Sequence, residues 1–209
     1  MATILLTAGP TRAYVDDVRF LSNASSGRMA AAIATAAVAA GHEVVIVSGP
    51  VHVKYPARAR VIPVVTTGEM LEASLAELPR CDGVIAAAAP CDFAPKRRVA
   101  GKIPRQGAGL TLRLAPTPDV IATLARRARP RQWFVAFALE PGADPARAFA
   151  KIEAKRCDLI VVNDVTALEG TRTAVTVYDR GHATVGSKKG TKRAVATWLI
   201  RLFTSRFTG

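Results

Sequence analysis

Five continuous apolar runs, each the length of a short strand, recur along the chain between segments with helical periodicity. Such runs are typical of parallel strands that are covered on both faces. The expected strands are Ile4–Thr7, Val44–Ser48, Gly83–Ala88, Phe134–Phe137 and Leu159–Val162. The expected helices are Gly27–Ala40, Gly68–Leu78, Pro118–Ala128, Pro145–Arg156 and Lys192–Phe203. This order predicts an α/β fold in which helices cover both faces of a doubly wound, mainly parallel sheet, in three layers.

Two stretches interrupt this alternation. Residues 89–116 are too long for a tight strand-to-helix loop, and the alternation in Leu110–Leu114 predicts a small β-ribbon or flap there. Residues 173–185 predict a C-terminal hairpin that turns at Asp179-Arg180-Gly181. These departures leave the α/β class unchanged, because they lie between and after the alternating segments.

The composition limits the class of protein. The 209 residues are half apolar and contain no repeat or linker, so residues 1–209 are expected to form one domain with a full core. No apolar run reaches the roughly 20 residues of a membrane span. The start lacks the pattern of a signal peptide, so we expect a cytoplasmic protein without membrane contact. Cys81 and Cys157, which precede expected strands, are expected to be buried thiols, and Cys91 falls in a loop.

The formal net charge of +13 points to anionic partners. The basic residues are spread along the chain, without interleaved aromatic residues, zinc-ligand spacing or an RNA-binding signature. This pattern favours small anionic substrates over nucleic acid.

The first expected strand leads into a loop that suits phosphate. A Gly-Pro turn follows Thr7-Ala8, and Ser25-Ser26-Gly27 opens the first expected helix, where backbone N–H groups are free to bind an anion. The Gly-x-Gly-x-x-Gly pattern of dinucleotide sites is absent. Ligands of Rossmann-like sheets bind at the carboxyl ends of the strands. Here those ends carry Gly9–Asn23, Ser48-Gly49-Pro50, Ala86–Ala94, Phe137–Pro141 and Asn163-Asp164.

Short motifs in a fixed order resemble a known family. They are Thr7–Arg12, Val18–Met29, Ser48-Gly49-Pro50, Ala86-Ala87-Ala88 with Asp92, Lys102, Thr117-Pro118-Asp119, Val135-Ala136-Phe137, Lys151 with Lys155, and Asp158–Asp164. Together they resemble the phosphopantothenate–cysteine ligases (phosphopantothenoylcysteine synthetases), the family of DNA/pantothenate metabolism flavoprotein C-terminal domains. The resemblance extends over nearly the whole chain.

The resemblance implies a ligase of coenzyme A biosynthesis. Such enzymes join 4′-phosphopantothenate to L-cysteine through an acyl-nucleotidylate, with CTP or ATP as co-substrate and Mg²⁺ on the triphosphate. They release nucleoside monophosphate and pyrophosphate. The family also implies a homodimer in which residues 89–116 cross to a neighbouring subunit. Because residue 1 starts directly at the ligase-like strand, without a flavin-dependent decarboxylase half, we expect a stand-alone ligase without flavin.

The resemblance also assigns roles to residues. Asn23 and Lys102 are the implied catalytic residues. The implied substrate-binding residues are Arg19, Asn23, Ser25, Ser26 and Gly27. The implied nucleotide-binding residues are Gly9, Ser48, Gly49, Pro50, Ala86, Ala87, Ala88, Asp92, Ala115, Pro116, Thr117, Pro118, Phe137, Lys151 and Lys155. No residue is implied as a direct metal ligand.

Two features of this set follow from the residues themselves. Lys151 and Lys155 lie four residues apart on one expected helix and therefore project from the same face. Two like charges there are mildly unfavourable unless an anion sits between them. The resemblance implies that this pair binds the triphosphate. Thr117-Pro118 and Asp144-Pro145 are expected helix starts, in which an N-cap side chain precedes a proline.

Two other classes of function are weighed against the ligase. A short-chain-type NAD(P)-dependent oxidoreductase would need a glycine-rich first turn and a Tyr-x-x-x-Lys pair, and the sequence has neither. A non-catalytic nucleotide- or nucleic-acid-binding module would bind DNA in a salt-sensitive way without triphosphate turnover. The flap departs from the family in Lys102-Ile103-Pro104-Arg105, and Pro90-Cys91 is unusual, so the choice between CTP and ATP stays open.

Overall fold

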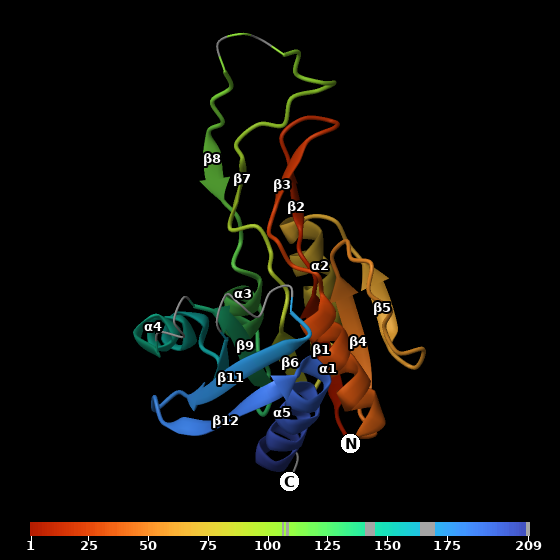
Figure 1. Ribbon diagram of the computed structural model, residues 1–209, viewed down its shortest axis with the longest axis vertical. Coiled ribbons are helices and arrows are strands. Elements are labelled where there is room, and N and C mark those ends of the chain that lie inside the picture. Colours follow the sequence, from red (N-terminus) through yellow and green to blue (C-terminus); the bar gives the residue numbers. More distant parts are fainter. Residues whose placement is uncertain (106, 108, 141–144, 164–169, 208–209) are drawn as a thin grey trace.

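An eight-stranded sheet forms the centre of the molecule in the computed structural model, which describes residues 1–105, 107, 109–140, 145–163 and 170–207 (Figure 1). From edge to edge the strands are β12 (Thr184–Thr191), β11 (Arg172–Asp179), β10 (Leu159–Asn163), β9 (Trp133–Leu139), β6 (Gly83–Ala86), β1 (Thr3–Ala8), β4 (Glu43–Ser48) and β5 (Arg60–Pro63). β11 pairs antiparallel with β10 and with β12, and the other neighbouring pairs are parallel. The predicted α/β class and mainly parallel sheet are confirmed.

The five predicted strands are present, with small shifts at their ends. β6 ends at Ala86 rather than Ala88, because the chain then follows the loop after β1. Ala87 N donates to Thr7 O at 3.2 Å, and Ala89 N donates to Gly9 O at 2.9 Å. The sequence does not predict β5, because this strand lies at the sheet edge and its residues are mostly exposed.

Helices cover both faces of the sheet, which confirms the three layers. α1 (Arg28–Ala39) and α5 (Lys192–Phe207) pack on one face. The other face carries α2 (Thr67–Glu77), α3 (Val120–Arg126) and α4 (Pro145–Lys155), with the short helix η1 (Leu78–Arg80) after α2. Within the described ranges, no helix has both the length and the apolar character needed to cross a membrane.

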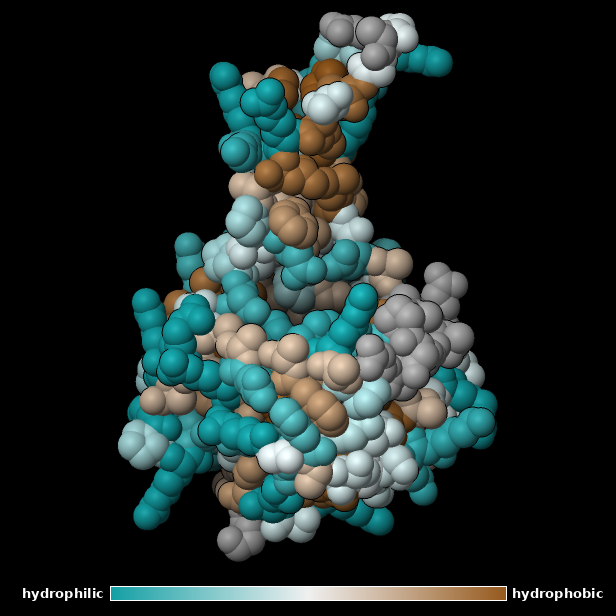
Figure 2. Space-filling model, turned by 90° about the vertical axis from the view of Figure 1, so that its left-hand side faces the viewer, coloured by the Kyte–Doolittle hydropathy of each residue, from teal (hydrophilic) through white to brown (hydrophobic). Residues whose placement is uncertain are grey.

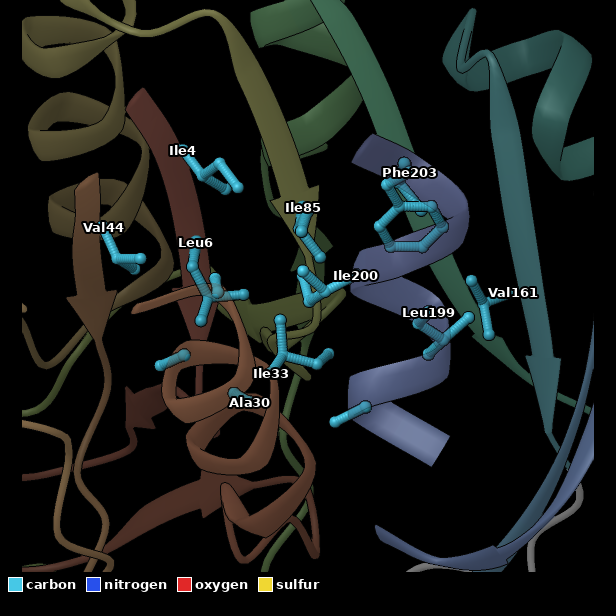
Figure 3. Packing of buried hydrophobic residues seen from close by; sticks show 14 of the residues in the cluster. Ile4, Leu6, Ala30, Ile33, Val44, Ile85, Val161, Leu199, Ile200 and Phe203 are labelled. Atoms are coloured by element: carbon cyan, nitrogen blue, oxygen red, sulfur yellow. The ribbon is translucent and has the colours of Figure 1, made fainter. Parts of the chain in front are cut away.

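The core between the sheet and the α1–α5 pair fixes where these two helices begin. Ile33 of α1 and Leu199 of α5 point toward Leu6, Ile85 and Val161 of the sheet (Figure 3). All five side chains are buried, and each contributes about 1.5–3 kcal/mol to folding. Both helices begin at the end of the sheet where the parallel strands have their carboxyl ends, and they run back along the sheet. Both helix N-termini therefore lie at that end.

The start of α3 differs from the prediction. Asp119 is the N-cap, and its side chain accepts a hydrogen bond from Ala122 N at 3.0 Å. Thr117 is not the cap, because its groups hold the preceding loop. Its amide donates to Asp92 O at 2.9 Å, and its hydroxyl donates to Cys91 O at 2.5 Å. α4 begins at Pro145 as expected, and Asp144 lies outside the described residues.

Two β-ribbons project together from the body of the molecule (Figure 1). One pairs β2 (Arg12–Tyr14) with β3 (Phe20–Ser22), and the other pairs β7 (Phe93–Pro95) with β8 (Leu114–Pro116). We call residues 12–22 and 93–116 the arm. A ribbon is thus present within the predicted insertion, but the alternating Leu110–Leu114 stretch contributes only Leu114 to it. The sequence predicts a plain loop where β2 and β3 form.

Two aspartates tie the halves of the arm together. Asp17 Oδ2 accepts from Gly101 N at 2.6 Å, and Asp17 Oδ1 lies 2.7 Å from an Arg98 nitrogen. Asp16 Oδ2 accepts from Ile103 N at 3.1 Å. Burial acts to raise the pKa of Asp16, but hydrogen bonds from the backbone amides of Arg19, Val18 and Ile103, together with the Arg19 charge, outweigh burial, so the pKa is lowered. The pKa of Asp17 is also lowered, chiefly by the Gly101 and Arg98 hydrogen bonds.

The predicted C-terminal hairpin and the buried thiols are both confirmed. β11 and β12 are joined at the predicted turn, where Asp179 Oδ1 accepts from Gly181 N at 3.0 Å and from Ala183 N at 3.1 Å. All three cysteines are buried and free. Burial raises the pKa of Cys81 to about 11 and that of Cys157 to about 12, so neither is a thiolate at neutral pH.

Candidate active site

A cleft opens at the carboxyl ends of the parallel strands. It has a main chamber of about 510 Å³ and a narrow lobe of about 110 Å³. The two parts share Ala88, Pro90, Asp92, Phe137 and Lys155. The cleft therefore lies where ligands of doubly wound sheets bind, and it is continuous from the start of α1 to the start of α3.

One wall of the main chamber is the start of α1, formed by Ser25, Ser26, Gly27 and Arg28. Gly27 is the N-cap at φ 72°, no side chain caps the helix, and its first turn has no acidic residue. A Cβ at Gly27 would lie 2.8 Å from Val51 Cγ1, so glycine is needed for both its conformation and its contacts. The first amides of α1 are therefore available to an anion, as predicted for this segment.

Asn23 is held at the mouth of the same chamber. Its Nδ2 donates to Ala89 O at 3.2 Å and to Pro90 O at 2.8 Å. Both amide N–H groups are thus directed at the loop after β6. Oδ1 is the atom left to meet a ligand, so the side chain is arranged to accept a hydrogen bond.

The narrow lobe is an apolar slot with a polar rim. Phe137, Val120 and Ile121 supply apolar walls, and Asp92 and Thr117 lie at the rim. Small side chains at the end of β6 leave room for a ligand to lie against the sheet; they are Ala86, Ala87 and Ala88. This shape suits a flat ring whose edge carries hydrogen-bonding groups.

Lys151 and Lys155 of α4 both line the cleft, as predicted. Each lysine also has a carboxylate partner of its own, which the sequence analysis did not predict. Lys151 pairs with Glu140, which is 2% exposed at the end of β9. Lys155 Nζ lies 2.7 Å from Asp119 Oδ2. The carboxylates position the two ammonium groups at the cleft before any ligand arrives.

Four predicted nucleotide contacts pack beside the cleft rather than lining it. A Cβ at Gly9 would lie 2.7 Å from Val51 Cγ1, and a Cβ at Gly49 would lie 1.7 Å from Pro10 O. Ser48 is buried, and its hydroxyl is 2.8 Å from Tyr55 OH. In this structure Gly9, Ser48, Gly49 and Pro50 lie where the loops after β1 and β4 approach each other closely. Their contact with a nucleotide stays a prediction.

Four further predicted residues lie on the arm and do not line the cleft of their own chain: Arg19, Lys102, Ala115 and Pro116. Arg19 donates to Ile103 O at 3.0 Å and lies 3.2 Å from Asp16 Oδ2. This places Arg19 beside the segment that carries Lys102. Asn23 and the lysine pair line the cleft, whereas Arg19 and Lys102 do not.

The main chamber is also lined by residues to which the sequence analysis gave no role in binding. They are Arg28, Met29, Asn163, Thr173, Val175 and Lys192. Asn163 does fall at a predicted strand end, and Asp164 beside it lies outside the described residues. Thr173 and Lys192 belong to no local sequence motif. They reach the cleft because the C-terminal hairpin pairs with β10.

The described residues contain no group of three or more His, Cys, Asp and Glu side chains that could hold a metal ion. A magnesium ion carried by a triphosphate needs only phosphate oxygens and water, with one or two carboxylates at most. Asp92, at the rim shared by the two parts of the cleft, is suited to such a contact.

Several known proteins are similar to this chain. A protein named cysteine/cysteine sulfinic acid decarboxylase, from an unknown prokaryotic organism, is 38% identical over 95% of this chain and 56% of its own length. The coenzyme A biosynthesis bifunctional protein CoaBC of Bacillus subtilis is 42% identical over 78% of this chain and 40% of its own length. The chain thus spans about half the length of these relatives.

The fold and the family agree. The crystal structure of the C-terminal domain of a coenzyme A biosynthesis bifunctional protein CoaBC matches with a TM-score of 0.81, at 31% identity over 99% of this chain and 97% of that one. The family model described as the DNA/pantothenate metabolism flavoprotein C-terminal domain matches residues 1–206. The chain therefore belongs to the family of DNA/pantothenate metabolism flavoprotein C-terminal domains.

Proposed function

We propose that this chain is a ligase of coenzyme A biosynthesis that joins 4′-phosphopantothenate to L-cysteine through an acyl-nucleotidylate. One observation carries the proposal: segments far apart in the sequence meet in one cleft. They bring an uncapped helix start, a positioned asparagine, two held lysines and an apolar slot. The relatives named coenzyme A biosynthesis proteins support a role in that pathway.

The nucleotide fits the cleft in one direction. Its base would lie in the narrow lobe, between Phe137 and the start of α3, with Asp92 and Thr117 at its edge. Its phosphates would then extend past Lys155 and Lys151 into the main chamber, toward the first amides of α1. Ammonium groups and helix amides are the groups that stabilise phosphate charge. Mg²⁺ would enter on the triphosphate.

The reaction has two transfers, and both build negative charge. A carboxylate oxygen of the substrate attacks the α-phosphorus, the bond to the β-phosphate oxygen breaks, and pyrophosphate leaves. The amine of cysteine then attacks the acyl carbon, the bond to the nucleotidyl oxygen breaks, and nucleoside monophosphate leaves with the amide formed. Fixed cationic and N–H donors aimed at this charge lower both barriers.

Asn23 has a defined part in the second transfer. Because its amide nitrogen is bound to the carbonyls of Ala89 and Pro90, Oδ1 faces the ligand as an acceptor. An acceptor at this position would hold an N–H of the substrate or of the attacking amine and so orient it toward the acyl carbon.

The arm brings the second half of the site. Its exposed hydrophobic residues gather along the projection (Figure 2). They are Val18, Phe20, Leu21, Phe93, Val99, Leu110 and Leu114. Such a patch, on a part that carries Arg19 and Lys102 away from its own cleft, fits a second copy of this chain. In that homodimer, Lys102 would act at the partner's cleft.

The remaining features complete the proposal. An acid–amine condensation driven by a nucleoside triphosphate needs no redox group, so the ligation itself is proposed to proceed without flavin. The substrates are small cytoplasmic metabolites, which makes the cytoplasm the expected place of action. CTP and ATP are both offered as co-substrates, because the narrow lobe has hydrogen-bonding groups for either base.

Pyrophosphate release with 4′-phosphopantothenate, cysteine and either CTP or ATP tests the function. We expect release that requires all three substrates, and the ratio of the two rates identifies the nucleotide. Release of carbon dioxide from cysteine or cysteine sulfinate, without nucleotide, would contradict the proposal. So would salt-sensitive DNA binding without triphosphate turnover, or oxidation of NAD(P)H in place of ligation.

Mixing two inactive variants tests the shared site. If Asn23 and Lys102 of one site come from different subunits, a mixed dimer of Asn23→Ala and Lys102→Gln chains has one intact site and one doubly altered site. Random mixing should then restore about a quarter of the native activity. If both residues belonged to one chain, the mixture would stay as inactive as its components.

A further inference from the structure

A closed circuit of hydrogen bonds is buried beside the narrow lobe of the cleft. Cys91 N donates to Thr11 Oγ1 at 2.8 Å, Thr11 Oγ1 lies 2.8 Å from Thr67 Oγ1, and Thr67 Oγ1 donates to Cys91 O at 3.3 Å. A threonine hydroxyl has a single proton to donate. Because Thr67 gives its proton to Cys91, it accepts from Thr11, so the two hydroxyls have one defined orientation. Thr11 is 0% exposed, and Thr67 and Cys91 are each 5% exposed.

The two hydroxyls are brought together by the chain segments that carry them. Arg12 N, next to the first hydroxyl, donates to Val65 O at 2.8 Å. Two residues after Val65, Thr67 is the first residue of α2. The start of that helix is fixed by a capping box, in which Thr66 and Glu69 each bind the backbone of the other. The circuit therefore joins the chain just before the arm to the start of α2 and to the loop after β6.

The circuit holds a segment that lines the narrow lobe. Cys91 and Asp92 both line this lobe, whereas Thr11 and Thr67 do not. A second set of bonds holds the same segment from α3, since the Thr117 hydroxyl donates to Cys91 O at 2.5 Å and the Thr117 amide donates to Asp92 O at 2.9 Å. The two buried hydroxyls can therefore affect a ligand in the lobe only through the Cys91–Asp92 backbone.

The loop between β6 and β7 depends on side chains of other elements for its position. Asn23 Nδ2 donates to Ala89 O and to Pro90 O, and the circuit binds the peptide groups of Cys91. A buried polar network of this kind is rigid when every member is satisfied, and it is costly when one member is lost. Removal of one hydroxyl should therefore displace the loop, together with the residues that it presents to the lobe.

We propose that Thr11 and Thr67 are positioning residues for the nucleotide. Through the Cys91 peptide, they hold Asp92 at the rim of the narrow lobe, where the base would lie. This inference rests on the proposed function for the identity of the ligand. Neither hydroxyl touches the nucleotide, and no bond is made or broken at either one.

Thr67→Val opens the circuit, because valine has the shape of threonine and no hydroxyl. The Thr11 hydroxyl then has no acceptor for its proton, and Cys91 O loses one of its two donors. The dissociation constant of CTP or ATP, whichever the native chain binds more tightly, should rise about fivefold to tenfold. The KM for that nucleotide should rise by a similar factor, whereas kcat should stay within about twofold, because the lysines of α4 are unaltered.

Thr11→Val opens the same circuit at its other hydroxyl. It should weaken nucleotide binding as much as Thr67→Val does. The double variant should bind little more weakly than either single variant, because the two changes break one network. Hydrogen exchange gives a readout without any ligand: the protection of the Cys91 amide, which donates to Thr11, should fall in all three variants.

Two controls separate positioning from stability. Thr67→Ser keeps the hydroxyl and should bind the nucleotide within about twofold of the native affinity. Ile33→Val removes one methylene from the core at α1, does not alter the cleft lining, and should lower the melting temperature by about 1–5 °C with native nucleotide affinity. Calorimetric titration measures the dissociation constants, and thermal unfolding measures stability.

The outcomes separate this inference from the proposed function. Native nucleotide affinity in both valine variants would overturn the positioning role, as would an equal loss of affinity in Ile33→Val or in Thr67→Ser. Nucleotide binding that depends on the circuit, in a chain that does not join phosphopantothenate to cysteine, would keep the positioning role and remove the ligase. Ligation by the native chain with unaltered affinity in both valine variants would do the reverse. A native chain that binds neither nucleotide would overturn both.

Discussion

Lys155 Nζ lies 2.7 Å from Asp119 Oδ2, so the residue that caps α3 also holds a lysine of α4 across the cleft. The other oxygen of Asp119 accepts from Ala122 N at 3.0 Å. One carboxylate therefore fixes both the start of a helix and the position of an ammonium group. The pair is partly exposed, so its value lies in positioning rather than in stability.

Two substitutions at Asp119 separate these roles. Asparagine is as good an N-cap as aspartate, so Asp119→Asn should lower the free energy of unfolding by less than about 0.5 kcal/mol. Asp119→Ala also removes the cap and should lower it by about 1 kcal/mol. Both variants should raise the KM for the nucleotide to a similar extent, because both release Lys155. Urea unfolding and initial rates measure the two effects. An unchanged nucleotide KM in both would show that the ion pair does not position Lys155.

Lys102 should matter for chemistry more than for binding. Lys102→Gln removes a charge that would follow the developing negative charge at the reacting centre, so amide formation should fall by about a hundredfold or more. The dissociation constant of the nucleotide should change by only a few-fold, since α4 and the narrow lobe remain intact. Single-turnover kinetics measure the rate of amide formation, and nucleotide titration measures the dissociation constant.

The matched control for Lys102 is Arg97→Gln, which removes one positive charge from an exposed position on the same arm. Similar losses in both variants would mean that the arm acts only through its overall charge. A Lys102→Gln enzyme with native rates would remove this lysine from the mechanism.

Gly27→Ala should damage the fold locally at the phosphate end of the cleft. Gly27 and Gly101 both have positive φ, at 72° and 73°. Each change to alanine costs about 1–2 kcal/mol from the left-handed backbone alone. Only at Gly27 would the new Cβ also meet a neighbour, Val51 Cγ1 at 2.8 Å, whereas nothing lies within 4 Å at Gly101. Thermal unfolding should therefore show the larger decrease in melting temperature for Gly27→Ala. Equal decreases would show that the Val51 side chain moves to make room for the new Cβ.

Acid should loosen the arm before it unfolds the body. Asp16 and Asp17 have lowered pKa values in the folded chain, so their contribution is complete above the unfolded value near 4 and is lost as the pH falls through the folded values. The protection of the Gly101 and Ile103 amides against hydrogen exchange, measured relative to the intrinsic rate at each pH, should then fall below about pH 4. In Asp17→Asn, exchange at Gly101 should already be fast at neutral pH. Protection that does not change with pH would contradict this account.

The alternation of apolar runs was sufficient to predict five strands of the central sheet and five helices, because strands buried on both faces carry a strong local signal. β5 and the β2–β3 hairpin gave no such signal. The first is exposed at an edge, and the second is held by long-range bonds from residues such as Asp16 to Ile103. The start of α3 was misplaced because Thr117 and Asp119 are both good caps, and only the tertiary contact of Thr117 with Cys91 decides between them.

Cleft residues that belong to local sequence motifs were predictable. Those that reach the cleft only through pairing between distant elements were not. Asn23, Asp92 and the α4 lysines line the cleft, as their resemblance to the ligases implied. The partners Glu140 and Asp119, which hold those lysines, were not predicted, because pairing across elements leaves no trace in local sequence. Thr173 was missed for the same reason, since its strand is placed beside β10 only by the sheet.

The separation of Lys102 from the cleft of its own chain has a consequence for how activity depends on protein concentration. If the arm of one copy completes the site of another, each chain contributes residues to two active sites. A single chain then forms no complete active site by itself. Specific activity should then decline when the protein is diluted below the dissociation constant of the dimer. In cells that contain little of this protein, its total activity would fall more steeply than its concentration.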